Sequence, residues 1–273
     1  MTALRTPGAR LRAPRRLLSL IALEIWLPLL LLVIWWFASE SSTAVYFPPL
    51  RVILQSFADN WLTPDRALAN LVPSLQVIGI GYGAALVGGI AFGTLLGLAR
   101  PFERAVRPIV ESLRAIPGVA LLPLFIVLFG IDQPMRILLV AYGAAWPVLL
   151  NTLDGVRAVE PVLLDMARVF RVGRARRLFQ LILPSAGPQI FAGARISLAI
   201  TLIIMVISET VGASGGVGYF LMTAKSEFRI SSMWSAIIAL GVLGYLLNIL
   251  FRIAERFILR WHRLQQARLE TAS

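Results

Sequence analysis

The sequence predicts an all-α, polytopic membrane protein with six transmembrane helices and a cytoplasmic coupling helix-turn-helix. Of its 273 residues, 58% are hydrophobic and 15% are charged, whereas soluble domains have about 45–50% and 25%. The mean hydropathy is +0.79, so the chain holds more apolar surface than one soluble core can bury. This composition excludes a cytosolic enzyme and a disordered chain, and the absence of cysteine excludes a disulfide-stapled secreted domain.

Six apolar runs predict the spans, because a helix needs about 20 mostly apolar residues to cross a bilayer core of roughly 30 Å. The runs lie at residues 17–38, 70–99, 106–130, 136–155, 187–210 and 233–257. Pro117-Gly118 and Pro123 interrupt the third run, so we expect it to form two helical pieces. The first run is longer than the roughly 7–15 apolar residues of a signal peptide, so we expect it to be a span that is not cleaved.

The arginines predict the orientation of the chain in a cell inner (plasma) membrane. If the N-terminus is inside, 19 of the 26 Lys and Arg residues fall on the cytoplasmic side and five fall outside. Cytoplasmic loops carry an excess of basic residues, so both termini are predicted to be cytoplasmic. The net charge of +12 is then explained by topology and by anionic membrane lipids, with no need for nucleic acid.

Two further patterns lie in the first half of the chain. After Pro48-Pro49, the apolar residues of 50–57 recur at helical spacing, which predicts a short amphipathic helix on the outer surface. The second span carries small residues at repeated intervals, which let another helix approach closely. These are Gly79, Gly83, Gly89, Gly93 and Gly97. They indicate either packing within the subunit or a helix that lines a moving interface.

The loop at residues 157–186 is too long and too patterned for an ordinary connection. Glu160-Pro161 is a favourable helix start, with proline in the first turn and a carboxylate at the positive end of the helix dipole. Gly173 permits a left-handed break before a second short helix, and we expect Pro184 to stop that helix before the next span. We predict one apolar face made of Val159, Leu163, Ala167 and Phe170.

A helix-turn-helix with an apolar face and exposed arginines predicts docking. Spans tether it at both ends, which disfavours DNA as the partner. Adsorption to anionic lipid and binding of a cytoplasmic protein both remain open, and the protein partner fits the apolar face better.

The residues of this loop resemble the EAA loop of ATP-binding-cassette importer permeases, whose pattern is Glu-Ala-Ala, three residues, Gly, nine residues, then Ile-x-Leu-Pro. Asp165-Met166-Ala167 occupies the first triplet. Arg171 occupies the glycine position, and 181–184 ends in Leu183-Pro184 at the required distance. The spacing matches throughout, while several identities differ, so Gly173 is expected to supply the turn in place of Arg171.

Other stretches carry the same resemblance and point to the branch that handles aliphatic sulfonates, taurine, nitrate, bicarbonate or thiamine-pathway pyrimidines. They are Pro48-Pro49, the segment from Arg114 to Ile131, the segment from Trp146 to Thr152, and Ser208-Glu209-Thr210 with the glycines that follow. The resemblance implies a basic cytoplasmic tail at 1–16, a first span with its external exit at 17–47, an importer transmembrane domain at 48–262 that contains the coupling loop, and a cytoplasmic tail at 263–273.

The resemblance implies that ATP hydrolysis occurs on a separate cytoplasmic ATP-binding subunit. In agreement, the only lysine, Lys225, follows Ala224 and cannot complete a phosphate-binding Gly-x-x-x-x-Gly-Lys loop. It also implies a substrate-binding protein and a second permease copy. In the family the carboxylate of the loop pairs with a basic residue of the ATPase, a role that would fall to Asp165. The predicted coupling residues are Glu160, Asp165, Met166, Ala167, Arg168, Arg171, Gly173, Arg174, Leu183 and Pro184.

Ionisable residues inside spans are functional candidates because they are costly in a bilayer. Glu111 and Arg114 are three residues apart, so we expect them to pair on one helix face, with a place on the translocation path as the alternative. Arg195 either reaches back to lipid headgroups or faces the path. Glu209 is either an interfacial carboxylate or part of a gate or of a docking surface for the binding protein.

No nucleophile–base pair and no cluster with metal-ligand spacing is present in the sequence, so we expect no catalysis, metal or cofactor in this chain. Two other functions remain conceivable. A membrane-embedded enzyme would need a polar catalytic cluster, which the sequence lacks. A secondary transporter or channel driven by an ion gradient would need no ATPase partner, and the coupling loop disfavours it.

Overall fold

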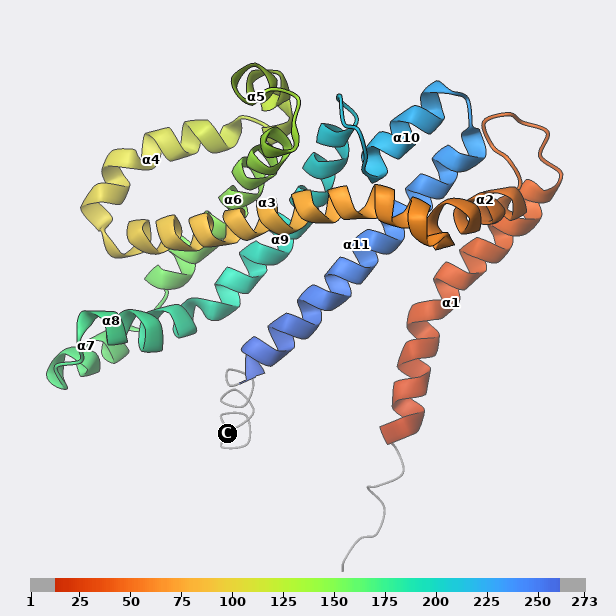
Figure 1. Cartoon of the computed structure of the whole chain (residues 1–273). Coiled ribbons are helices and arrows are strands. Elements are labelled where there is room, and N and C mark those ends of the chain that lie inside the picture. The colour runs from red at the N-terminus through yellow and green to blue at the C-terminus, as the bar shows by residue number, and fades with distance from the viewer. Residues whose placement is uncertain (1–12, 261–273) are drawn as a thin grey trace, which may run out of the picture.

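The computed structural model describes residues 13–260, which form only helices and the turns between them (Figure 1). The predicted tails at 1–16 and 263–273 lie largely or wholly outside these residues. The helices are α1 (Ala13–Glu40), α2 (Leu50–Phe57), η1 (Ala58–Leu62, a π-turn), α3 (Pro64–Leu98), α4 (Arg100–Ala115), η2 (Gly118–Leu121, a 3₁₀ turn), α5 (Leu122–Phe129), α6 (Gln133–Arg157), α7 (Pro161–Val169), α8 (Arg174–Arg177), η3 (Leu178–Ile182, a π-turn), α9 (Leu183–Glu209), α10 (Val217–Ser226) and α11 (Ile230–Ile258).

The described residues contain four helices long and apolar enough to cross a membrane: α3, α6, α11 and the continuous helix Arg174–Glu209, which joins α8, η3 and α9. The bent pair of α4 with η2 and α5 counts as a fifth candidate. The sequence predicts six spans, so the structure supports a polytopic helical protein with a smaller number of clear crossings. The predicted first run lies within α1, of which only Leu29–Glu40 qualifies as a shorter apolar helix.

The predicted break in the third run is confirmed. The axes of α4 and of the Gly118–Phe129 segment differ by 84°. Ile116 at the break has φ −78° and ψ 117°, the extended conformation that a residue before proline prefers. Because Pro117 follows it, α4 cannot continue, and its amphipathic helix turns away from the apolar α5.

The α3–α6 contact is a regular small-residue seam. A Cβ atom added to Gly89 would lie 2.7 Å from Val148 Cβ, and one added to Gly97 would lie 2.8 Å from Val156 Cβ. Gly93 is closer still to α6, since its added Cβ would lie 2.5 Å from the carbonyl oxygen of Leu149. Backbones this close need glycine at the contact, so these glycines serve packing within the subunit.

The other two glycines of that stripe do not pack within the subunit, so for them only the alternative of a moving interface stays a prediction. Gly79 and Gly83 have nothing within 4 Å of an added Cβ. The seam continues instead through Gly81, whose added Cβ would lie 2.7 Å from Val140. The reason is rotation about the helix: Gly81 lies eight residues before Gly89 on one face, whereas Gly79 and Gly83 lie on another.

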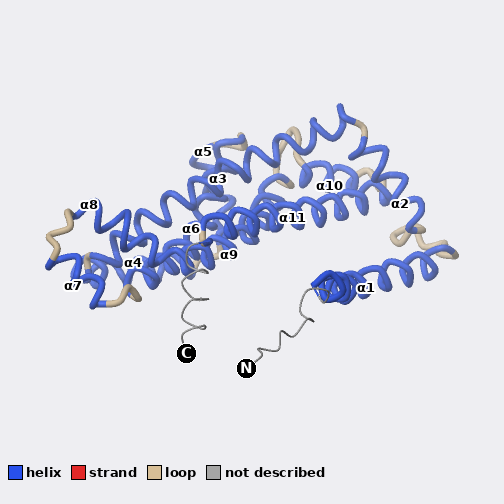
Figure 2. The backbone as a smooth tube through the Cα atoms, turned by 90° about the horizontal axis from the view of Figure 1, so that it is seen from below, coloured by secondary structure: helices blue, strands red, loops and turns tan. Residues whose placement is uncertain are grey.

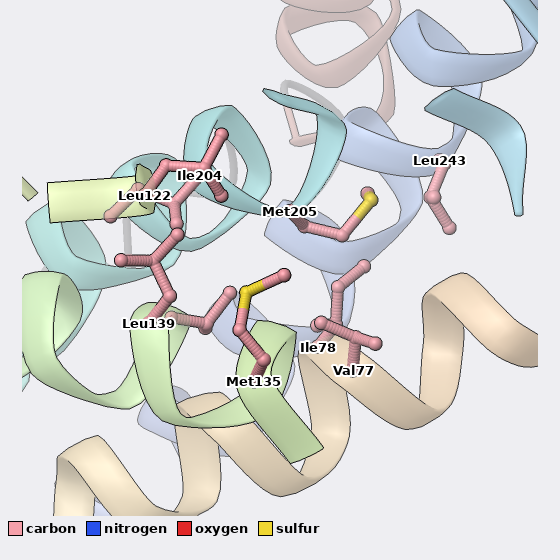
Figure 3. Close-up of a cluster of buried hydrophobic side chains, with 9 residues drawn as sticks. Val77, Ile78, Leu122, Met135, Leu139, Ile204, Met205 and Leu243 are labelled. Atoms are coloured by element: carbon pink, nitrogen blue, oxygen red, sulfur yellow. The ribbon is translucent and has the colours of Figure 1, made fainter. Parts of the chain in front are cut away.

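The central core joins five helices (Figure 3). α3, α5, α6, α9 and α11 each contribute to one buried apolar cluster. Its members are Val77, Ile78, Leu122, Met135, Leu139, Val140, Ile204, Met205 and Leu243. Met135 and Met205 are fully buried, and thioether side chains fill irregular gaps between helices that cross at different angles.

The two ends of the molecule differ. The α7–α8 hairpin lies at one end of the elongated bundle, while α2 and α10 lie at the other (Figures 1 and 2). Near α2, α1 meets the bundle through an aromatic cluster in which the rings of Trp35 and Trp234 are 5.8 Å apart. From there α1 diverges from α11 (Figure 1), and its side chains from Leu29 to Phe37 are mostly exposed.

Candidate functional site: the α7–α8 hairpin and the charged groups of the bundle

The α7–α8 hairpin, residues 160–182, packs on the ends of α6 and α9. One face of it is buried in a small apolar cluster of Val156, Val159, Ile182 and Ala186, with Leu164, Leu178 and Ile190 against it. Glu160 and Pro161 begin α7 as predicted. The cluster therefore ties the hairpin to two long helices, α6 and α9.

The opposite face of α7 is apolar and exposed. Val162, Met166, Val169 and Phe170 are 65%, 51%, 78% and 74% exposed, and their spacing of four, three and one places them on one side of the helix. The predicted docking face of Val159, Leu163, Ala167 and Phe170 is therefore wrong as a set, because Val159 and Ala167 are buried against the bundle and only Phe170 lies on the exposed face. Phe170 follows the last residue of α7, where the chain leaves the helix and the ring turns outward.

The turn between the helices is a Schellman motif. The amide of Arg171 donates to the carbonyl of Arg168, and the amide of Val172 donates to the carbonyl of Ala167, both at 2.9 Å. Such a turn needs one left-handed residue, most often glycine. Here Arg171 takes that conformation with φ 51°. This is the position at which the EAA pattern has glycine.

The prediction that Gly173 supplies the turn is wrong. Gly173 has φ −58° and ψ 150° and caps α8, a conformation open to any residue. The backbone keeps the geometry that the spacing of the motif implies, although arginine has replaced the usual residue. Sequence identity at the turn was therefore a poorer guide than spacing.

Replacing Arg171 with glycine is expected to stabilise the turn by about 0.5–1 kcal/mol, because a left-handed conformation strains residues that carry a Cβ. Hydrogen–deuterium exchange should then slow about two- to fivefold at the Val172 amide. Gly173→Ala is the control, since its φ is ordinary and nothing lies within 4 Å of an added Cβ. Unchanged or faster exchange in Arg171→Gly would contradict the assignment of strain to this residue.

The charged groups of the hairpin are solvated. Asp165 Oδ1 accepts a hydrogen bond from Arg168 at 2.8 Å, and both side chains are more than 60% exposed. Such a pair contributes little to stability, so either partner can exchange it for another charged group. Arg174 is exposed at the start of α8.

The prediction that Pro184 stops the second helix is wrong. The helix runs on from Arg174 to Glu209, and Leu183 and Pro184 lie within it. The π-turn η3 immediately precedes this proline, and the Leu183 amide donates to the carbonyl of Leu178, five residues earlier. This wider hydrogen bonding accommodates a proline that lacks an amide donor. The second helix of the hairpin and the fifth predicted span are thus one rigid rod.

At the opposite end of the bundle, Glu209 is 1% exposed, so the predictions of an interfacial carboxylate and of a docking surface are wrong, and a part in a gate stays a prediction. Its Oε1 and Oε2 accept hydrogen bonds from Ser74 Oγ at 2.8 and 2.9 Å, and Oε2 also accepts from the Gly218 amide at 2.8 Å. Ser74 Oγ accepts in turn from the Val217 amide at 2.9 Å. One carboxylate thereby joins α3, α9 and the first turn of α10, whose amides have no partner within the helix.

The glycine-rich turn before α10 is shaped by this carboxylate. An added Cβ on Gly216 would lie 2.5 Å from the Glu209 carboxyl carbon, and Gly216 has φ 115°. Arg136 lies nearby, 7% exposed, and donates to the carbonyls of Ile131 and Gly212 at 3.0 and 3.3 Å. The sequence indicated Glu209 but not Ser74 or Arg136, because no local pattern links residues this far apart.

One further prediction for a charged group is wrong: Glu111 pairs with Arg107, at 2.8 Å and one helical turn away, and not with Arg114. Arg195 forms an ion pair with Glu255 of α11 and keeps a half-exposed side chain. Arg114 instead lines a cavity beside α6. Among residues 13–260, no group of three or more His, Asp or Glu side chains has the arrangement of a metal site.

Fold and surface together define a class: a polytopic helical membrane protein with an exposed apolar helix face at one end. The family described as "Binding-protein-dependent transport system inner membrane component" matches residues 85–261, and the chain belongs to this family. It is therefore a multi-pass permease subunit of an inner-membrane ABC transporter. Such permeases work with a binding protein and with a separate ATPase subunit that hydrolyses the ATP.

Several proteins of the family resemble the chain over most of its length. The putative aliphatic sulfonates transport permease protein SsuC of Bacillus subtilis (strain 168) is 34% identical and covers 86% of both chains. The bicarbonate transport system permease protein CmpB of Synechococcus elongatus is 31% identical, over 84% of this chain and 86% of its own. The taurine transport system permease protein TauC of Escherichia coli (strain K12) is 29% identical, over 89% and 90%.

The fold also resembles solved structures. An inward-facing structure of the MetNI methionine ABC transporter has a TM-score of 0.62 at 21% identity, and the match covers 70% of this chain and 95% of that one. An amino acid ABC transporter crystallised with histidines has a TM-score of 0.52 at 16% identity, with 77% and 96% covered. At these identities the likeness concerns the fold alone.

Proposed function

We propose that the chain forms the translocation path for a small anionic or zwitterionic solute of the sulfonate, taurine, nitrate or bicarbonate kind. A substrate-binding protein delivers the solute, and the ATPase drives the path through the 157–186 loop. The relatives named above transport solutes of this kind and support the solute class. The domain at 48–262 contains the matched region, and the bent third element and α1 complete six spans with both termini in the cytoplasm.

The exposed apolar face of α7 is the observation that carries this proposal. Four large apolar side chains are open to solvent there, at the end of the molecule that also holds a concentration of arginines. A patch of this kind on a water-exposed element marks a protein-binding surface. The buried face is anchored on α6 and α9, so movement of a bound ATPase would turn both helices as one body.

The chemistry of the hairpin also suits this partner. Asp165 would leave its exposed pair with Arg168 and bind a basic residue of the ATPase, as the family pattern implies. Ala167 is buried beneath α7, Arg171 forms the turn that follows it, and Met166 lies on the exposed face that would contact the ATPase. The long rod from Arg174 through Leu183 and Pro184 then connects docking to the membrane. Coupling requires that the ATPase contact differ between two states of the bundle.

We also propose that two copies of the chain share the path. A single bundle of this size leaves α5 exposed, with Leu124, Val127 and Leu128 between 50% and 82% open. Closed symmetric pairs are the commonest assembly of identical subunits. Arg114 and Arg195 would favour anions on the path, whereas Glu111 and Glu209 serve the structure through Arg107 and Ser74.

The docking proposal is tested by purification from detergent with the ATPase subunit co-expressed. Val169→Asp with Phe170→Asp should reduce the retained ATPase at least tenfold, because charges replace the centre of the apolar face. Phe228→Asp is the control, since Phe228 is 71% exposed and also lies just after the end of a helix, α10. Equal retention by both variants would remove the α7 face from the interface.

A further inference from the structure

A cavity of about 260 Å³ lies between α4, the last turns of α6 and the end of α3. Four of its lining residues are apolar: Leu96, Val110, Leu150 and Leu153. The other six are charged: Glu103, Arg107, Glu111, Arg114, Asp154 and Arg157. Three cations and three anions thus gather around one small space at this end of the bundle.

Four of the six charges neutralise each other. Arg107 binds Glu111 at 2.8 Å, and Arg157 binds Glu103 at 3.0 Å. The second pair joins α4 to α6 and is half-withdrawn from solvent, because the Glu103 side chain is only 12% exposed. These pairs fix the walls of the cavity and leave little net charge there.

The remaining two charges, Arg114 on α4 and Asp154 on α6, have no ion-pair or hydrogen-bonding side-chain partner among residues 13–260. Both side chains are exposed to the cavity region. One unpaired guanidinium and one unpaired carboxylate therefore line the same space from opposite helices. A ligand that carries both signs of charge can contact both groups at once, which a singly charged ligand cannot do.

We propose that this cavity binds a small zwitterion, with the acid group of the ligand on Arg114 and its ammonium group on Asp154. An arginine fork suits a sulfonate or carboxylate, and a carboxylate suits an ammonium ion. An anion without an amine would satisfy Arg114 but leave Asp154 as a repelling charge. The volume lies just below the roughly 300–1,000 Å³ of pockets for drug-sized ligands, which suits a smaller solute.

This inference rests on the proposed function, because it takes the arginine-rich end of the bundle as the cytoplasmic side of the path. The cavity would then hold the solute at the point of release, next to the connection between α6 and α7. Within the proposed class of anionic and zwitterionic solutes, it selects aminosulfonates and similar zwitterions and disfavours simple anions.

The test measures equilibrium binding to the full-length permease in nanodiscs, with 2-aminoethanesulfonate and ethanesulfonate as probes. We expect the aminosulfonate to bind at least tenfold more tightly. Asp154→Asn should weaken aminosulfonate binding about tenfold or more and leave ethanesulfonate unchanged or tighter, since a charge-assisted hydrogen bond is lost. Arg114→Gln should weaken both probes. Glu227→Gln, an exposed carboxylate distant along the chain and paired with Arg229, should alter neither.

The same zwitterion chemistry occurs in the phosphoethanolamine headgroup of membrane lipids, so binding is measured in two lipid compositions. In phosphatidylglycerol discs the aminosulfonate should bind as described. If added phosphatidylethanolamine displaces it, and Asp154→Asn abolishes that displacement, the cavity is a zwitterion site occupied by lipid. If displacement is absent, the free solute is the ligand.

Equal affinity for the two sulfonates, or an equal effect of Asp154→Asn on both, would overturn the proposal. So would the absence of saturable binding in either lipid. Retention of the ATPase is measured on the same preparations. If the permease retains the ATPase but does not distinguish the two sulfonates, the zwitterion site is disproved and the docking proposal is not.

Discussion

Gly93→Val should destabilise the folded chain by about 3 kcal/mol or more. An added Cβ at this position would lie 2.5 Å from the Leu149 carbonyl oxygen and 2.7 Å from Thr152 Cβ. The nearer atom belongs to the backbone of α6, so the clash can be relieved only if α3 and α6 move apart along their contact. Overpacking of an ordinary core costs about 1–3 kcal/mol even where side chains can adjust.

The measurement is the thermal transition of the purified chain in detergent, followed by intrinsic tryptophan fluorescence. Gly79→Val is a close control: it makes the same substitution in the same helix, where an added Cβ has nothing within 4 Å. It carries the same change in helix propensity, so the difference between the two variants isolates the clash. Equal transition temperatures would show that α3 and α6 are not packed at this seam.

Glu209→Ala is expected to cost about 3 kcal/mol or more and to release α10 from the bundle. The variant leaves Ser74 Oγ and the Gly218 amide without their acceptor in a buried site. Each buried donor left without a hydrogen-bond acceptor lowers the free energy of unfolding by about 1–3 kcal/mol. Glu227→Ala provides the control, because its carboxylate is exposed in a surface ion pair whose loss costs at most about 1 kcal/mol.

A double-mutant cycle with Ser74→Ala separates the clamp from general loss of packing. Since Ser74 and Glu209 act on one network, the double variant should be less destabilised than the sum of the singles. Limited proteolysis between Gly212 and Val217 should increase in both single variants. Additive free energies with unchanged proteolysis would mean that the two residues stabilise the chain independently.

Sequence reasoning located most helices because run length and proline position act locally. The apolar runs predicted α3, α6, α9 and α11, and the Pro117 break predicted the bend before α5. Sequence reasoning failed where the orientation of a residue around its helix axis decides which neighbour it contacts. Gly79 and Gly89 look alike in sequence, but only Gly89 faces α6, and no single-chain pattern reveals the partner helix.

The candidate site shows the same division. The spacing of the 157–186 loop predicted two helices and a turn, but the turn lies at Arg171, where the family pattern has glycine, and not at Gly173 as predicted. Contacts between distant or competing residues were not predictable. Ser74 hydrogen-bonds to Glu209 across a separation of 135 residues in sequence, and Glu111 forms its ion pair with Arg107 and not with Arg114. Pairing among several nearby charges depends on side-chain geometry, which the sequence leaves open.

ATP-driven solute accumulation in proteoliposomes tests the central claim most directly. The vesicles would contain the chain with its ATPase, and the binding protein would be supplied on the opposite side of the membrane from ATP. With the native α7 face we expect accumulation that depends on ATP. The Val169→Asp, Phe170→Asp variant should insert and fold but accumulate less than a tenth as much solute, while Phe228→Asp behaves as the native chain does. Accumulation at the native rate by the double variant would contradict a mechanism in which the ATPase drives the permease through this hairpin.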